Sequence, residues 1–147
     1  MKRRDLLLFG VLVLMGSEKV DPTKDRERKY EVVVTPLAGP VGVGASLAAK
    51  LAIQCKEDAY VHPDAPFKIV ATSENETLKV TKEVLTRGDA EGAKLGEKAT
   101  VLKFAIPVSA AAKGDGVVKA SLSFFLCTPA WCHNMKKDMT WSVVIDH

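Results

Sequence analysis

The sequence is poor in the patterns that most enzymes and nucleic-acid-binding proteins display. Its 147 residues include only three histidines and three cysteines. We find no Ser/His/Asp triad, no paired carboxylates placed for acid–base catalysis and no glycine-rich loop suited to a phosphate. No stripe of alternating aromatic and basic residues and no internal repeat is present either. With these classes disfavoured, the cysteines become the residues most able to carry chemistry.

Long hydrophobic runs are also missing, because the longest is shorter than the about 20 residues that a membrane-spanning helix needs. That run, residues 6–16, follows the basic stretch Lys2, Arg3 and Arg4. The composition predicts that residues 1–17 are an export signal or an uncleaved anchor, and the adjacent arginines also fit a twin-arginine signal. Residues 18–29 have almost no apolar content and are predicted to be a flexible charged tether.

The excess of positive charge belongs largely to the N-terminal segment. The chain has 21 basic and 18 acidic residues, of which residues 1–17 hold three and one, so 18 basic and 17 acidic residues remain. A nearly neutral remainder gives no support for a nucleic-acid partner. We expect contact with a membrane only through the signal, if it is uncleaved. The length of residues 30–147 suits one domain.

From Tyr30 onward, the alternation of apolar and polar residues is typical of β-strands. In SLAAKLAIQC, residues 46–55, Cys55 falls on the apolar face and is predicted to be a buried free thiol. Further strands are expected at Glu31–Thr35, Phe67–Thr72, Thr77–Leu85, Thr100–Val108, Val117–Leu126 and Thr140–Asp146. The segment KGDG, residues 113–116, has the composition of a hairpin turn, and residues 86–99 are expected to form a long loop. About seven short strands at this spacing predict an all-β, antiparallel β-sandwich.

Two of the cysteines lie in LCTPAWCHNM, residues 126–135, between the last two expected strands. Residues facing each other across antiparallel strands are close enough for a disulfide, so a turn formed by TPAW would let Cys127 and Cys132 meet. Export would place the pair in an oxidising compartment. The spacing alone leaves three interpretations open: a structural disulfide, a redox-active dithiol and half of a metal site.

The neighbours of the pair bear on its reactivity. His133 adjoins Cys132, and Lys136 and Lys137 are expected in the same loop, where their positive charge would favour a thiolate on Cys132. A disulfide that closes so short a loop restricts the unfolded chain little, which weakens a purely structural role. A thioredoxin fold is excluded, because the C-x-x-C spacing and a βαβ pattern are both absent.

A copper site is the metal alternative. Its ligands would be Cys132, His133, Met135 and Met139, with a distant His62, and these are the residue types of a blue-copper centre on a β-sandwich. The spacings differ from those of a cupredoxin loop, a second cysteine intervenes, and methionines at such positions are more often packing residues. We therefore expect no metal and no cofactor, and keep a copper-binding, cupredoxin-like carrier as an alternative.

Three segments together, DAYVHPDAPFKI, VVKASLSFFLCTPAWC and TWSVVI, carry a resemblance to a known family. They are similar to the N-terminal periplasmic domain of DsbD-type thiol:disulfide interchange proteins and the related disulfide bond corrector domains, over about residues 30–147. The resemblance implies an immunoglobulin-like sandwich whose Cys127/Cys132 pair accepts electrons from a membrane donor and passes them to periplasmic thiol proteins.

The first functional hypothesis is therefore a periplasmic or secreted thiol-disulfide exchange domain. In it Cys127 and Cys132 are the redox pair and His133 stabilises the thiolate of Cys132. The alternative from another class is a non-catalytic, protein-binding β-sandwich in which the same disulfide braces the loop.

Overall fold

The computed structural model describes residues 26–92 and 98–147, which form two antiparallel sheets packed face to face. Its strands are β2 (Tyr30–Thr35), β3 (Ser46–Cys55), β4 (Tyr60–Val61), β5 (Lys68–Ser73), β6 (Leu78–Val80), β7 (Val84–Leu85), β8 (Val101–Ala110), β9 (Gly114–Cys127) and β10 (Cys132–Ile145). A short 3₁₀ helix, η2 (Arg87–Asp89), follows β7. The predicted all-β, immunoglobulin-like antiparallel sandwich is confirmed.

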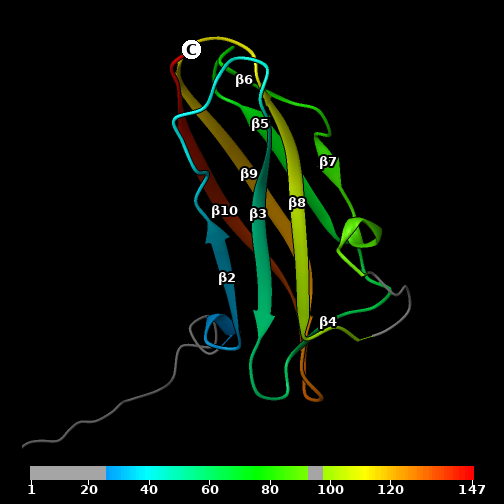
Figure 1. Cartoon of the computed structure of the whole chain (residues 1–147). Helices are drawn as coiled ribbons and strands as arrows, with labels where there is room; N and C mark the ends of the chain where they lie inside the picture. The colour runs from blue at the N-terminus through cyan, green and yellow to red at the C-terminus, as the bar shows by residue number, and fades with distance from the viewer. Residues whose placement is uncertain (1–25, 93–97) are drawn as a thin grey trace, which may run out of the picture.

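The two sheets share the strands unequally. One has the order β2-β3-β8-β6, and the other has the order β10-β9-β5-β7 with the short β4 paired to β9. In Figure 1, β3 and β8 cross in front of β9 and β10, and the loop between β9 and β10 lies at the end of the sandwich opposite to the C-terminus. The tip of β3, where Cys55 lies, is at this same end.

The core lies between the sheets and is built from the alternate residues of each strand. Phe104 and Phe124 are buried, and both pack against Phe67, with ring centroids 5.1 and 6.2 Å away. Trp141 is also buried, and its Nε1 donates a hydrogen bond to the backbone oxygen of Lys50 in the facing sheet, at 3.3 Å. Because period-two alternation sorts side chains between core and solvent, the strand predictions from the sequence were close along most of the chain.

Two of the predictions, one strand and one turn, were wrong. The predicted strand Thr77–Leu85 is two short strands, because β6 pairs with β8 in one sheet whereas β7 pairs with β5 in the other. The segment 113–116 does not close a hairpin, since β8 and β9 belong to different sheets; residues 111–113 connect the two layers, and residues 114–116 are already in β9. Both errors arise because a sequence pattern predicts strands but not their partners.

The last strand is also longer than predicted. It begins at Cys132 and not at Thr140, and β9 and β10 pair without interruption from Cys127 opposite Cys132 to Gly114 opposite Ile145. The cysteines are therefore the end residues of two paired strands, and only residues 128–131 form the loop.

The predicted signal, residues 1–17, and most of the predicted tether lie outside the described residues. Residues 26–29 form a turn in which the backbone N–H of Lys29 donates to the carbonyl of Arg26, at 3.0 Å. The Nζ of Lys29 forms ion pairs with Glu57 and Asp58, the latter at 3.1 Å. In the described ranges, no helix is long and apolar enough to cross a membrane.

Candidate functional site

The candidate site is a disulfide that joins Cys127 at the end of β9 to Cys132 at the start of β10. The S–S bond is 2.05 Å long and the Cα atoms are 4.0 Å apart. Such a separation is close to the about 4.5 Å of a non-hydrogen-bonded cross-strand pair. The predicted meeting of the two cysteines across TPAW is confirmed.

The loop itself is a compact turn. The backbone N–H of Thr128 donates to the carbonyl of Trp131 at 2.7 Å, and the backbone N–H of Ala130 donates to the Thr128 hydroxyl at 3.1 Å. Pro129 fixes one backbone torsion inside this turn. The hairpin is thus closed by its own hydrogen bonds as well as by the disulfide.

The two cysteines differ strongly in exposure. Cys127 is 0% exposed, whereas Cys132 is exposed. The difference follows from the strand order: Cys127 has Tyr60 of β4 on one side and Cys132 on the other, while Cys132 lies on the edge strand β10. A reagent or partner therefore reaches the sulfur of Cys132 first.

The ring of Tyr60 also has the positive charge of Lys98 over it. The Nζ of Lys98 lies 4.7 Å from the centre of the Tyr60 ring, a cation–π distance. Tyr60 was not predicted as a site residue from the sequence. The alternation in the segment AYVH could have indicated its position. Ala59 and Val61 are buried in the core, so Tyr60 between them points to the opposite face, where the disulfide lies.

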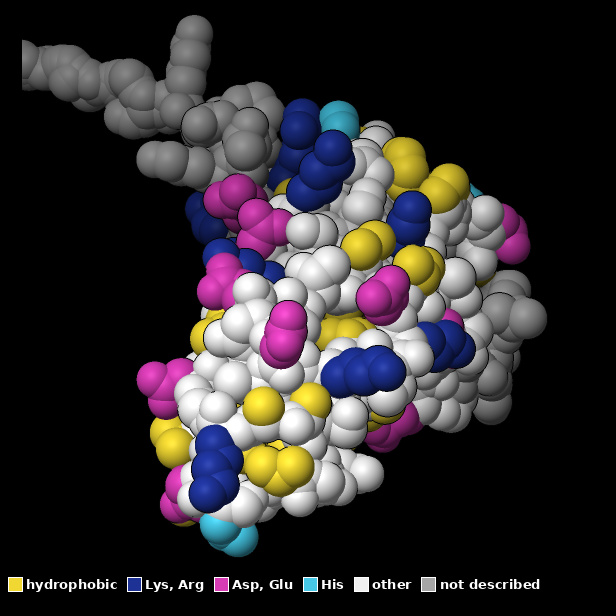
Figure 2. All heavy atoms as spheres, turned by 90° about the horizontal axis from the view of Figure 1, so that it is seen from above, with side chains coloured by type: hydrophobic (Ala, Val, Ile, Leu, Met, Phe, Trp, Pro, Cys, Tyr) yellow, Lys and Arg dark blue, Asp and Glu magenta, His cyan; other side chains and the backbone are white. Residues whose placement is uncertain are grey.

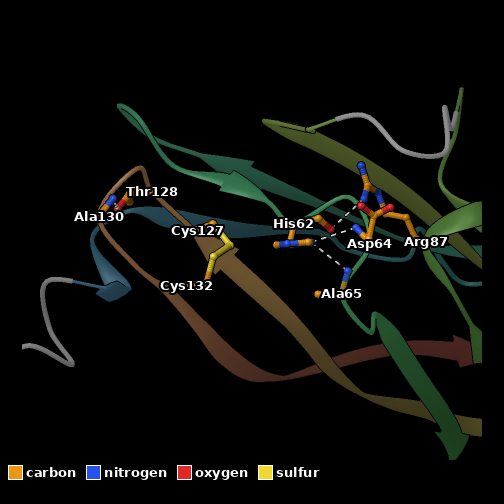
Figure 3. The surroundings of a disulfide bond; sticks show 8 residues. All are labelled: His62, Asp64, Ala65, Arg87, Cys127, Thr128, Ala130 and Cys132. Atoms are coloured by element: carbon orange, nitrogen blue, oxygen red, sulfur yellow. Dashed lines mark hydrogen bonds between the residues drawn. A yellow bond between two sulfur atoms is a disulfide. The ribbon is translucent and has the colours of Figure 1, made fainter.

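His62 belongs to the surroundings of the disulfide, as Figure 3 shows. Its backbone N–H donates to the carbonyl of Phe125 at 3.0 Å, which continues the pairing of β4 with β9. Its Nδ1 accepts hydrogen bonds from the backbone N–H groups of Asp64 and Ala65, both at 3.0 Å. Because Nδ1 is an acceptor twice over, the neutral ring carries its proton on Nε2.

Arg87 supports the same turn from η2. It is 8% exposed, and its Nη1 donates to the carbonyl oxygen of His62 at 3.2 Å. The segment predicted to be a long loop thus places a buried guanidinium behind the HPDAP turn. Long-range contacts of this kind leave no periodic signal in the sequence.

The sequence predicted that His133 would lie close enough to Cys132 to stabilise its thiolate, and the structure places the two side chains on different faces of β10. Adjacent residues of a strand project from opposite faces, so His133 and Cys132 point away from one another. The His133 ring lies against Trp131, with centroids 5.3 Å apart, and Trp131 packs on the core. The role of His133 as a thiolate stabiliser stays a prediction, and the structure gives it no side-chain contact with Cys132.

The two lysines were wrongly assigned to the loop. Lys136 and Lys137 lie within β10 and are exposed. With a rise of about 3.3 Å per residue, Lys136 is about 13 Å along the strand from Cys132, which exceeds the distance over which salt screens exposed charges, about 8 to 10 Å. Their contribution to a thiolate on Cys132 is therefore small.

The proposed copper ligands do not converge. Cys132 is bonded to Cys127 on the outer face, whereas Met135 and Met139 are 8% and 5% exposed and belong to the core. In the part of the chain that the structure describes, no group of three or more His, Cys, Asp or Glu side chains is placed to hold a metal ion. The methionines are packing residues.

Cys55 is a free thiol that is half-buried and packs against the core. Its orientation toward the apolar face agrees with the alternation of β3. Burial raises the pKa of its thiol from the usual 9.0 to about 11. At neutral pH, Cys55 is therefore almost entirely protonated, and it is a poor nucleophile.

Charged and apolar side chains are dispersed over the face that Figure 2 shows. Figure 2 shows acidic and basic side chains interspersed across one end of the molecule, with hydrophobic side chains scattered between them. Among the described residues the exposed large hydrophobic ones are Val33, Val43, Val84, Val101 and Val144. Because they come from different strands and from a loop, we base no site on them.

Comparisons with known proteins assign no family to this chain. No protein family model and no curated protein matches the sequence. Solved structures with some similarity include Escherichia coli alpha-2-macroglobulin from its MG7 domain to the C-terminus (19% identity, 78% of this chain and 17% of that chain, TM-score 0.44). Others are a conjugative transposon lipoprotein from Bacteroides eggerthii (11%, 76% and 96%, TM-score 0.37) and a PapD-like domain of human CEP192 (12%, 91% and 97%, TM-score 0.46). This chain thus spans a small part of the macroglobulin, and at these identities and TM-scores we draw no functional conclusion from any of the three.

Proposed function

We propose that this protein is an exported thiol-disulfide exchange domain that passes electrons from a membrane dithiol donor to periplasmic thiol proteins through Cys127 and Cys132. The observation that carries the proposal is the unequal exposure of one disulfide, in which Cys132 is exposed and Cys127 is fully buried. Exchange proceeds through one accessible sulfur that meets the partner and a second that resolves the mixed disulfide. The residues that resemble a DsbD-type N-terminal domain and the composition of residues 1–17 add support.

The exchange follows from these positions. In the reduced protein, the Cys132 thiolate attacks a partner disulfide, so one partner sulfur leaves as a thiolate and a mixed disulfide forms. Cys127 then loses its proton and attacks the sulfur of Cys132, which releases the second partner thiolate and restores the Cys127–Cys132 bond. The partner gains two electrons, and a membrane protein with a reduced cysteine pair supplies two electrons to return the domain to its dithiol form.

The assignment of Cys132 as the attacking sulfur rests on access. The sequence interpretation chose the same residue because of His133, but strand geometry turns that ring to the other face. The edge position of β10 supplies a different reason for the same choice, since only Cys132 can be approached from solvent.

A measurement of the reduction potential tests the proposal. The protein is equilibrated with glutathione or dithiothreitol redox buffers, and the thiol state of the pair is read by mass after alkylation. We expect a potential well above about −300 mV, within the range of exchange proteins. A lower value marks a structural bond and rules out exchange.

A non-catalytic, protein-binding sandwich is the second candidate, and the position of the lysines favours it. Because Lys136 and Lys137 lie along β10, they do little to lower the pKa of a thiol at Cys132. In this case, replacing both Cys127 and Cys132 with serine lowers the melting temperature and leaves the binding of a captured partner unchanged. Loss of that binding would instead favour exchange.

A further inference from the structure

Strand β10 forms an edge of its sheet, and its free side runs past the disulfide. The hydrogen bonds of Val41, at the far end of the same edge, show which residues of β10 point their backbone N–H and C=O groups away from β9. The N–H of Val41 donates to the carbonyl of Val144, and the N–H of Asp146 donates to the carbonyl of Val41, both at 3.0 Å. These contacts form a single parallel β-bridge between Val41 and Ile145, so the far end of this edge already accepts backbone hydrogen bonding from another segment of the chain.

Alternation extends that direction along the strand. If Val144 points its N–H and C=O away from β9, then so do the even-numbered residues before it, down to Asn134 and Cys132, because the register of β9 and β10 is unbroken. Among the residues that the structure describes, Val41 is the one that bonds to this edge. Edges with such unpaired groups are templates for added strands.

From this placement we propose that the free edge of β10 binds an extended polypeptide segment carrying a cysteine, which pairs as an added antiparallel strand with its cysteine directly opposite Cys132. The inference rests on the proposed function, since it names how a thiol partner is recognised. The partner is an unfolded or extended segment, and the binding energy comes from its backbone.

The order of strands makes this position suitable for exchange. Cys127, Cys132 and the partner cysteine would lie on three neighbouring strands, about 4.8 Å apart and on the same face. The partner sulfur then approaches Cys132 from the side opposite to Cys127, in line with the bond that breaks. The partner thiolate forms a bond to the sulfur of Cys132, and the electron pair of the old bond leaves on Cys127; the reverse path releases the partner.

The same edge favours another protein over a second copy of this chain. A second copy could set its own Cys132 opposite this one only by overlapping two strand ends, because each chain turns back at Trp131. Lys136 is exposed and shares its face with Cys132, so an acidic side chain four positions from the partner cysteine would be attracted to it. The occupant is therefore an extended segment with a cysteine and an acidic residue four positions before it.

A kinetic experiment tests this docking. The full chain with Cys127→Ser keeps Cys132 as the reacting thiol, and its fold is verified by circular dichroism. It is mixed with the peptide Glu-Val-Thr-Val-Cys-Val-Thr-Val-Glu, whose cysteine carries thionitrobenzoate, and with N-acetylcysteine activated in the same way. The Cys132 thiolate attacks the probe sulfur and releases thionitrobenzoate, which is followed by its absorbance. The variant with serine at both Cys127 and Cys132 gives the background from Cys55.

We expect the peptide to react about tenfold faster than the small probe, because docking positions its sulfur. Asn134→Pro removes an edge N–H without breaking a backbone hydrogen bond to β9, and the bond that it loses there is the one from the side-chain Nδ2 of Asn134 to Ser123 Oγ. It should abolish the peptide's advantage and leave the small probe unchanged. Thr140→Pro, the same change further along the edge, should have no effect. A peptide N-methylated at both threonines should lose its advantage on the Cys127→Ser protein, which gives a test independent of proline folding defects.

Equal rates for the two probes would overturn the docking proposal. So would an advantage that survives both Asn134→Pro and N-methylation, or a disulfide-linked dimer forming in place of the peptide adduct. The proposed function fails on a different measurement, a reduction potential of the wild-type pair below about −300 mV. Such a value would not change the relative rates of the two probes, so the two failures can be told apart.

Discussion

Tyr60 on β4 lies directly opposite Cys127 on β9, so Cys127 has a strand neighbour on each side, whereas Cys132 has one on a single side. This relationship separates two cysteines that a sequence motif treats alike. In the proposed exchange, this difference in access is the reason to give Cys132 the contact with partners and Cys127 the resolving step.

The first prediction concerns this difference in access. When the reduced protein is treated briefly with iodoacetamide at neutral pH, we expect Cys132 to be alkylated at least about tenfold faster than Cys127, because Cys127 is fully buried. Mass spectrometry of proteolytic peptides measures the two rates. Equal labelling would show that the reduced hairpin opens and that burial does not select the sulfur.

The second prediction concerns Tyr60 as a cover for Cys127. Tyr60→Ala removes the ring that flanks Cys127 and that Lys98 approaches, so the disulfide should be reduced several-fold faster by dithiothreitol. Tyr60→Phe keeps the ring and is the matched control, with an expected rate close to that of the wild type. If alanine and phenylalanine give the same rate, the ring does not limit access to the bond.

The strand pattern could be predicted where it alternates cleanly, and the start of β10 shows where this fails. Its inward residues include Met135 and Met139, but Lys137 between them is exposed, and the outward residues are Asn, Lys and Asp, which are poor strand formers. An edge strand tolerates such residues because one of its sides faces water. The meeting of Cys127 and Cys132 could be predicted from spacing, because a four-residue turn brings the ends of two antiparallel strands together, but the spacing did not decide what the pair does.

The faces of the site residues were harder to predict, because they depend on where the strand begins. Once Cys132 is a strand residue, His133 must point to the opposite face, and a loop assignment hides this. The contacts from Tyr60 and Arg87 come from segments distant in the sequence, and neither a motif nor a periodicity connects them with the cysteines.

The third prediction concerns the turn beside the disulfide. His62→Ala removes the acceptor for the N–H groups of Asp64 and Ala65, so the free energy of unfolding should fall by about 1 to 2 kcal/mol. His62→Asn places a side-chain oxygen near the same donors and should restore part of the loss. Urea denaturation of the three proteins with the disulfide intact measures the effect. An unchanged midpoint for His62→Ala would mean that water replaces the imidazole at no cost.

The fourth prediction concerns the stability of the protein in alkaline solution. Burial raises the pKa of the Cys55 thiol from 9.0 to about 11, so the folded chain holds the proton more tightly than the unfolded chain. The stabilisation from the neutral thiol is fully present below about pH 9 and is lost as the pH rises from 9 to 11, because only the unfolded chain ionises at first. The loss is at most about 3 kcal/mol.

The variant Cys55→Ala isolates this contribution, since Tyr30 and the lysines titrate in both proteins. We expect the difference in unfolding free energy between wild type and variant, measured by urea denaturation at several pH values, to be constant up to about pH 8.5. Above that it should shift progressively against the wild type until about pH 11, as the linkage requires. A difference that stays constant up to pH 11 would mean that the Cys55 thiol ionises as readily in the folded protein as in the unfolded chain, and that the lower end of β3 admits water.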